Sequence, residues 1–200
     1  MEPGWPSRFA GVGRRAARVL FAGLAALAAA GCATTPVTVP DRVYTGRFSA
    51  IATLAEKRET LSGRFSVEVR GHLQTIDLST PLGTTVARIE VRPDGARVSG
   101  AGMPEVRGTD ADALTEQLLG WRLPVSGMSD WIEGRPAPGR PARVEREGSR
   151  PVLIEQDGWI VRLSETFEAS GRPRLIVLER PPASPAPGVI LRLIVDDPAA

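Results

Sequence analysis

The chain of 200 residues has few of the side chains that most often build covalent or metal-bound sites. Cys32 is its only cysteine, which excludes an intrachain disulfide and any metal cluster held by several thiolates. His72 is its only histidine, so no pair of histidines can hold zinc, and a Gly-x-Ser-x-Gly nucleophile motif is missing. These absences argue against an enzyme and predict neither a metal nor another cofactor.

Long apolar runs are also scarce. The longest, residues 19–30, has twelve residues, which suits a signal peptide and is too short for a membrane-spanning helix. Four arginines precede this run, so residues 1–31 are predicted to be a leader. That leader has a net charge of +3 in a chain of net charge +2, which leaves about −1 for the rest. The bulk charge therefore gives no reason to expect nucleic-acid binding.

The leader ends in residues 27–32, LAAAGC, which resemble the lipobox of bacterial lipoproteins. The resemblance implies cleavage before Cys32, lipid on its sulfur and a third acyl chain on the new amino group. The alternative is an ordinary secretory leader that leaves a free exported thiol, which is uncommon. Ala33 stands where an aspartate would resemble an inner-membrane retention signal, so the resemblance implies the outer membrane. We predict a lipidated tether at 32–42 and a folded domain at 43–200.

Short segments in which apolar and polar residues alternate lie between prolines and glycines, and this pattern predicts β-strands with one buried face. In the clearest, residues 59–70, Leu61, Phe65 and Val67 share one face. We predict further strands at 44–52, 73–79, 85–92, 96–99, 142–146, 152–156, 159–163, 175–180 and 189–195. The sequence thus predicts a mainly β fold of antiparallel strands.

Two short helices are predicted in the middle of the chain. Thr109 is a candidate N-cap for a helix in which Ala111, Leu114 and Leu118 recur at helical spacing. A second helix is predicted at 126–133, ended by Gly134. Because the apolar face of such a sheet must be shielded from water, we expect the two helices to lie over part of that face.

Four stretches resemble the LolB family of outer-membrane lipoprotein-insertion proteins. They are 44–52 (YTGRFSAIA), 76–85 (IDLSTPLGTT), 118–134 (LLGWRLPVSGMSDWIEG), and Asp157-Gly158-Trp159 followed by the last strand. The resemblance implies an open, half-closed antiparallel β-barrel with a short helical lid over an apolar cavity. It also implies a lipid-anchored outer-membrane protein, facing the periplasm, that accepts triacylated lipoproteins from the periplasmic carrier LolA and inserts them into outer-membrane phospholipid. No nucleotide or cofactor is implied, and we expect a monomer.

Two sets of site residues follow. Apolar side chains of the dry face are candidates to contact acyl chains, with a filled core as the alternative for each; they are Phe65, Val67, Ile89, Val91, Met128, Trp131, Trp159 and Val161. Leu82 lies in a turn with Pro81 and Gly83, and the resemblance implies that it protrudes for delivery into the membrane. The alternative is an isolated surface leucine, which is common on folded proteins.

Two alternatives remain open at this point. Arginines on the solvent-exposed face of the strands are candidates to bind an acidic partner or lipid headgroups, or else are merely solvated. They are Arg64, Arg70, Arg88 and Arg92. The rival function is a structural or adaptor outer-membrane lipoprotein with a filled core and no lipid-carrier activity. Saturable binding of an apolar probe would separate the carrier from the adaptor.

Overall fold

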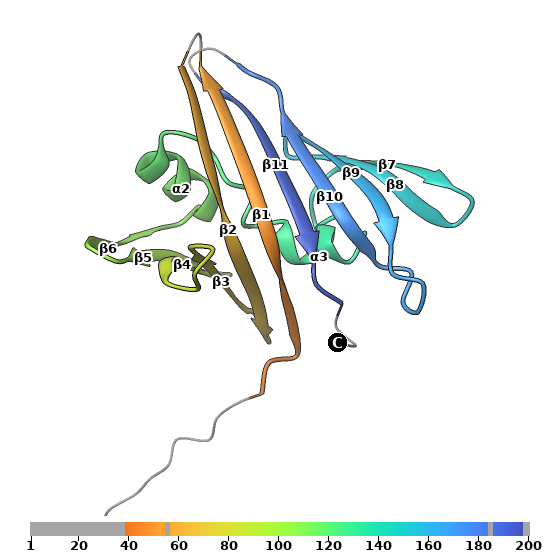
Figure 1. Cartoon of the computed structure of the whole chain (residues 1–200), viewed down its shortest axis with the longest axis horizontal. Coiled ribbons are helices and arrows are strands. Elements are labelled where there is room, and N and C mark those ends of the chain that lie inside the picture. Colours follow the sequence, from red (N-terminus) through yellow and green to blue (C-terminus); the bar gives the residue numbers. More distant parts are fainter. Residues whose placement is uncertain (1–38, 55–56, 184–185, 198–200) are drawn as a thin grey trace, which may run out of the picture. The chain divides into compact units, whose positions relative to one another are not determined.

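The computed structural model describes residues 39–54, 57–183 and 186–197 of the chain (Figure 1). Residues Val39–Ala200 form one compact unit. The predicted leader at 1–31, Cys32 and most of the predicted tether lie outside the described residues. Among those that are described, no helix has the length and hydropathy needed to cross a bilayer.

One antiparallel sheet of eleven strands dominates the described unit. Its centre is a long hairpin of β1 (Arg42–Leu54) and β2 (Lys57–Arg70), and β11 (Gly188–Val195) pairs with the other side of β1. The remaining strands are β3 (Leu73–Ser79), β4 (Thr85–Arg92), β5 (Gly95–Gly100), β6 (Met103–Gly108), β7 (Ala142–Glu147), β8 (Arg150–Gln156), β9 (Trp159–Thr166) and β10 (Pro173–Arg180).

The strand order is β6-β5-β4-β3-β2-β1-β11-β10-β9-β8-β7. Each strand pairs with its neighbour in this order, and β6 and β7 remain edges that do not pair with each other in the described part of the chain. The sheet curves without closing, as Figure 1 shows, which confirms the prediction of an open antiparallel barrel.

Glycines in the central hairpin allow aromatic rings to lie flat on the sheet. Gly46 on β1 is opposite Phe65 on β2. A Cβ atom at position 46 would lie 2.7 Å from the Phe65 ring and 2.2 Å from the carbonyl oxygen of Ile194. The absence of a side chain at Gly46 therefore permits the burial of Phe65, which is 3% exposed.

The strand predictions are confirmed with small changes in bounds, except that β6 was not predicted. Its sequence, MPEVRG, has one β-branched residue and contains Pro104, which only an edge strand tolerates easily. Leu61 lies on the predicted face of β2 but is 37% exposed, because β2 extends beyond the cover at this end. Ala87 and Val91 are only partly buried.

The two helices are α2 (Ala111–Leu119) and α3 (Met128–Ile132). The prediction that Thr109 caps the first helix is wrong: Asp110 is the N-cap, and its carboxylate accepts hydrogen bonds from the backbone N–H groups of Asp112 (2.9 Å) and Ala113 (3.1 Å). Because Asp110 is one residue closer to the helix than Thr109, its short acidic side chain reaches both free N–H groups. Helix α3 is shorter than the predicted 126–133, and Gly134 follows it with φ +73°.

Candidate functional site

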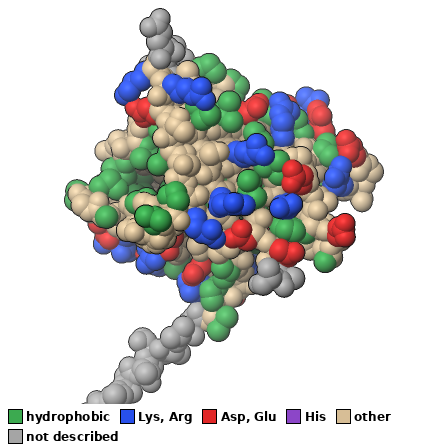
Figure 2. All heavy atoms as spheres, in the orientation of Figure 1, with side chains coloured by type: hydrophobic (Ala, Val, Ile, Leu, Met, Phe, Trp, Pro, Cys, Tyr) green, Lys and Arg blue, Asp and Glu red, His purple; other side chains and the backbone are tan. Residues whose placement is uncertain are grey.

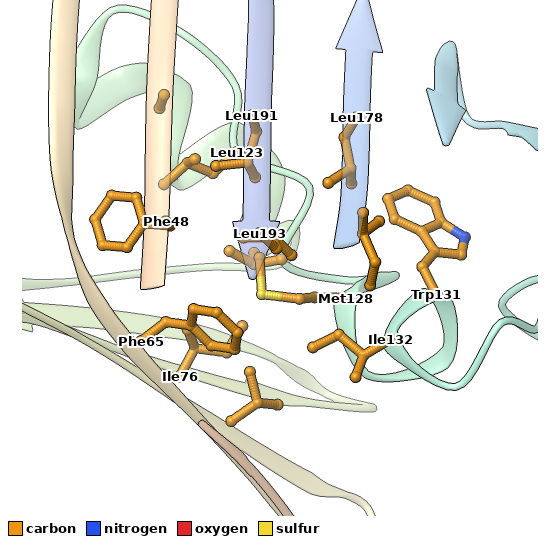
Figure 3. Close-up of a cluster of buried hydrophobic side chains, with 14 of the residues drawn as sticks. Phe48, Phe65, Ile76, Leu123, Met128, Trp131, Ile132, Leu178, Leu191 and Leu193 are labelled. Atoms are coloured by element: carbon orange, nitrogen blue, oxygen red, sulfur yellow. The ribbon is translucent and has the colours of Figure 1, made fainter. Parts of the chain in front are cut away.

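The concave face of the sheet is apolar and is covered by α3 and by a segment that we call the strap, residues 121–127. Trp121, Leu123 and Val125 of the strap are at most 5% exposed. Met128 and Ile132 of α3 are equally buried, and Figure 3 shows them reaching toward side chains of the sheet such as Phe65 and Leu193. We call the strap and α3 together the lid. The other helix that we predicted to cover the sheet, α2, contacts its β4–β6 side.

A small apolar hollow lies between the lid and the sheet, and partly exposed Leu61 borders it at one end. Its wall is entirely apolar and consists of Phe48, Leu61, Phe65, Ile76, Leu78, Leu123, Val125, Met128, Leu191 and Leu193. Its volume is about 10 Å³, which is room for about one water molecule. This apolar hollow is therefore nearly filled in this structure, and an acyl chain that enters it requires side chains to move apart.

The predicted cavity residues fall into three groups. Phe65 and Met128 line the hollow itself. A second group is buried in the core around it and comprises Val67, Ile89, Trp131, Trp159 and Val161. Val91 is only partly buried and packs against the edge of this core. The sequence did not place Leu123 and Val125 among the candidates to contact acyl chains, because residues of an irregular segment have no periodicity that marks a buried face.

Buried polar side chains join the lid to the sheet at three places. From β3, the amide of Gln74 donates to the carbonyl oxygen of Val125 at 2.6 Å. From β8, Gln156 accepts from the Trp131 indole N–H at 2.9 Å and from the Ala137 backbone N–H at 2.8 Å. It also donates to the Ala137 carbonyl oxygen at 2.9 Å. These few hydrogen bonds determine where the strap and α3 lie on an otherwise apolar face.

The strap is also joined to α2 by side chains of that helix. The Asp112 carboxylate accepts from the backbone N–H of Ser126 (2.9 Å) and from its hydroxyl (3.0 Å), and Thr115 Oγ1 accepts from the backbone N–H of Leu123 (2.9 Å). Burial raises the pKa of Asp112, and the hydrogen bonds from Ser126 oppose this effect. The strap therefore follows α2 as well as the sheet.

The third connection is a hydrogen bond from β1 to the end of α3. The Tyr44 hydroxyl donates to Glu133 Oε1 at 2.5 Å, and Arg172 lies 3.5 Å from the same oxygen. Burial raises the pKa of Tyr44 to about 12, and the hydrogen bond to Glu133 and the charge of Glu133 act in the same direction. The protonated phenol is thus the form that the folded state favours.

This raised pKa predicts a pH dependence that is directly measurable, because Tyr44 is the only tyrosine. Its absorbance as tyrosinate should have a midpoint near pH 12 in the folded protein and near the ordinary 10.0 in urea. A raised pKa means that its contribution to stability is full below pH 10 and is lost as the pH rises to 12. Tyr44→Phe should remove this part of the loss of stability at alkaline pH. Identical tyrosinate midpoints in the folded and unfolded protein would contradict the prediction.

Leu82 lies at the tip of the turn between β3 and β4 and is 96% exposed. The turn is closed by a hydrogen bond from the Gly83 N–H to the Thr80 carbonyl oxygen (2.9 Å) and another from the Thr80 N–H to the Thr84 carbonyl oxygen (2.9 Å). Gly83 has φ +90°, a conformation that other residues rarely adopt. The backbone of the turn is thus well defined and presents a large apolar side chain to solvent.

The four arginines predicted for the wet face all form ion pairs within the sheet. The pairs are Arg64–Asp196 (3.3 Å), Arg70–Glu68 (2.6 Å), Arg88–Asp77 (2.7 Å) and Arg92–Glu90 (3.4 Å). Figure 2 shows acidic and basic side chains interspersed over one face of the molecule. Exposed ion pairs of this kind contribute little to stability. Because each arginine is paired with a carboxylate, they also create no extended region of positive electrostatic potential on this face.

Groups for metal binding or acid–base chemistry do not gather at the lid. In the described ranges, no three His, Cys, Asp or Glu side chains lie close enough to hold a metal ion. His72 is exposed in the turn between β2 and β3. The interior therefore offers apolar contact surface and a few hydrogen bonds rather than reactive groups.

Comparisons with known proteins point to one family. The model of the family "Outer membrane lipoprotein LolB" matches residues 42–197. The chain is 40% identical over 164 residues to the outer-membrane lipoprotein LolB of Cupriavidus pinatubonensis, covering 78% of each chain. It is 38% identical over 189 residues to that of Bordetella petrii, covering 90% of this chain and 92% of the relative. A solved LolA superfamily protein from Nitrosomonas europaea superposes with a TM-score of 0.46 at 14% identity, covering 80% of this chain and 87% of that one.

Proposed function

Because this chain belongs to the LolB family, we propose that its covered apolar face shelters the acyl chains of lipoproteins and that its Leu82 turn delivers them into the bilayer. The protein is an outer-membrane lipoprotein that receives lipoproteins from LolA for insertion into that membrane, and it is not an enzyme. The observation that supports the proposal most directly is the apolar concave face beneath a lid that few hydrogen bonds join to the sheet.

The physical problem is the exposure of acyl chains to water. Each methylene group that leaves an apolar environment costs about 0.8 kcal/mol, so three acyl chains face a very large barrier to crossing water unprotected. Contact with the side chains of the concave face removes most of this barrier. Since such contacts are not directional, the same face accepts chains of different lengths.

Acyl chains that enter the apolar hollow must displace its wall, because it has only about 10 Å³ of free volume. The sheet side of the wall is held by continuous ladders of backbone hydrogen bonds. The lid side depends on the side chains of Gln74, Gln156 and Tyr44, whose hydrogen bonds can break one at a time. We therefore propose that the strap and α3 move away from a fixed sheet when acyl chains bind.

Delivery requires the domain to approach the bilayer in a defined orientation. Burial of one leucine side chain contributes about 1.5–3 kcal/mol, which biases orientation but does not anchor a domain. We assign the anchoring to lipid on Cys32, which is outside the described residues, and the orientation to Leu82 with its turn residues Pro81 and Gly83. A single chain provides both the sheet and the lid, so we propose that the protein acts as a monomer.

A transfer experiment tests this function. A complex of LolA with a triacylated lipoprotein is mixed with liposomes that carry the lipidated protein, and the lipoprotein in the liposomes is measured over time. We expect transfer to depend on the protein and to saturate with it. Equal incorporation into liposomes without the protein would overturn the proposal, and failure of the protein to bind any apolar probe would favour the adaptor alternative.

A further inference from the structure

Two nitrogen donors in the core lack an acceptor among the described residues. They are the indole Nε1 of Trp159 and the guanidinium Nη1 of Arg180, and both are buried. Trp159 as a whole is 1% exposed. The two side chains are neighbours, because the Arg180 guanidinium carbon lies 5.9 Å from the centre of the Trp159 ring. Arg180 also forms no ion pair with a carboxylate in the part of the chain that the structure describes.

The register places both donors on the concave face. Ile176 and Leu178, which are buried there, alternate with outward residues on β10, and Arg180 continues their row. Arg180 is opposite Val189 of β11, and Leu191 two residues further along β11 lines the hollow. Because two residues span about 7 Å of a strand, Arg180 lies one strand over and about 7 Å along from Leu191, and Trp159 on β9 lies one strand further.

A buried donor without an acceptor is costly, and a buried guanidinium donor is more so. Such groups are rare in native proteins, and a bound molecule that supplies the missing acceptor is one explanation for them. The apolar face on one side of the donors suits a hydrocarbon chain. On the other side, Trp159 and Pro181 border an open surface hollow of about 530 Å³, which gives room to a larger polar group.

We infer that Trp159 and Arg180 form a polar subsite for the carbonyl oxygens that join acyl chains to a lipoprotein's terminal cysteine. This inference rests on the proposed function and adds to it the direction in which a bound acyl chain lies on the sheet. The hydrocarbon chain extends from Arg180 toward Leu191, and the ester or amide oxygen accepts hydrogen bonds from the indole and guanidinium. The polar remainder of the client then leaves the concave face at the end where β10 ends and β9 begins.

Matched probes test the subsite separately from the apolar face. The mature chain with Cys32→Ala keeps the whole described unit and needs no detergent. Methyl laurate, tridecane and dodecyl phosphate are each used to displace a fluorescent naphthylamine probe. We expect the ester to bind about tenfold more tightly than the alkane. Arg180→Met should reduce this preference several-fold while leaving tridecane binding unchanged, and Trp159→Phe should reduce the ratio of ester to alkane affinity several-fold.

The controls make each outcome decisive. Arg192→Met replaces an exposed arginine on the outer face of β11 and should leave the ester preference intact. Thermal unfolding of Arg180→Met should show only a small loss of stability, because the substitution removes the contact with the Trp159 ring but no hydrogen bond of the buried Nη1. Equal binding of ester and alkane by the natural sequence, or an ester preference that survives both substitutions, overturns the subsite. A preference for dodecyl phosphate alone also overturns it, since it shows an anion site, whereas failure to bind any probe overturns the proposed function itself.

Discussion

Leu82→Glu is expected to lower the rate of lipoprotein insertion into liposomes at least tenfold, while folding and acceptance from LolA remain unchanged. Leu82 is 96% exposed, and its removal costs the folded state almost no packing. Insertion of the leucine into lipid contributes about 1.5–3 kcal/mol, and a glutamate opposes insertion instead. The difference acts only at the membrane step, so the lipoprotein should accumulate on the protein.

The measurement separates two steps by following the lipoprotein from LolA to the protein and then to the liposomes. Ile190→Glu is the matched control, because Ile190 is another exposed apolar residue, 47% exposed on β11, that is not at a turn tip. It should insert lipoproteins at the rate of the natural sequence. If Leu82→Glu also inserts them at that rate, the turn has no role in delivery.

Gln156→Leu is expected to cause the largest loss of stability among the polar contacts of the lid. The substitution leaves the Trp131 indole N–H and the Ala137 backbone N–H without their acceptor. Each buried donor that loses its partner costs about 1–3 kcal/mol, which gives about 2–6 kcal/mol together. In a domain of this size, a loss of that order lowers the midpoint of thermal unfolding by on the order of 10 °C.

Gln117→Leu is the matched control for this prediction. Gln117 is exposed on α2 and should tolerate the same substitution with a change of less than about 0.5 kcal/mol. Thermal and urea unfolding of both variants measure the difference. A Gln156→Leu protein as stable as the control would show that the Trp131 indole and the Ala137 backbone find other partners, and would contradict the assignment of Gln156 as a lid contact.

The nearly filled hollow has a consequence for release. If the lid must move before acyl chains bind, part of the contact energy is offset by the loss of lid contacts, and the net affinity is lower than the buried area suggests. Moderate affinity suits a protein that must pass its cargo to a bilayer. Variants with a weakened lid, such as Gln156→Leu, should therefore hold acyl probes more tightly whenever they remain folded.

Most of the fold could be predicted from local patterns in the sequence. Alternation in β2, β9 and β11 identified the buried faces, because side chains of a strand point to opposite sides in turn. The turn residues Pro81 and Gly83 located the loop that exposes Leu82. Strand β6 escaped prediction because an edge strand buries too few side chains to show a pattern.

The sequence by itself determined a mainly antiparallel sheet, the positions of its turns and the exposure of Leu82, since these depend on neighbours along the chain. Only the tertiary structure decided that the apolar hollow is nearly filled, that Gln74 and Gln156 hold the lid, and that Trp159 and Arg180 face each other without an acceptor. These features depend on residues far apart in the chain, and a local pattern contains no distance between such residues.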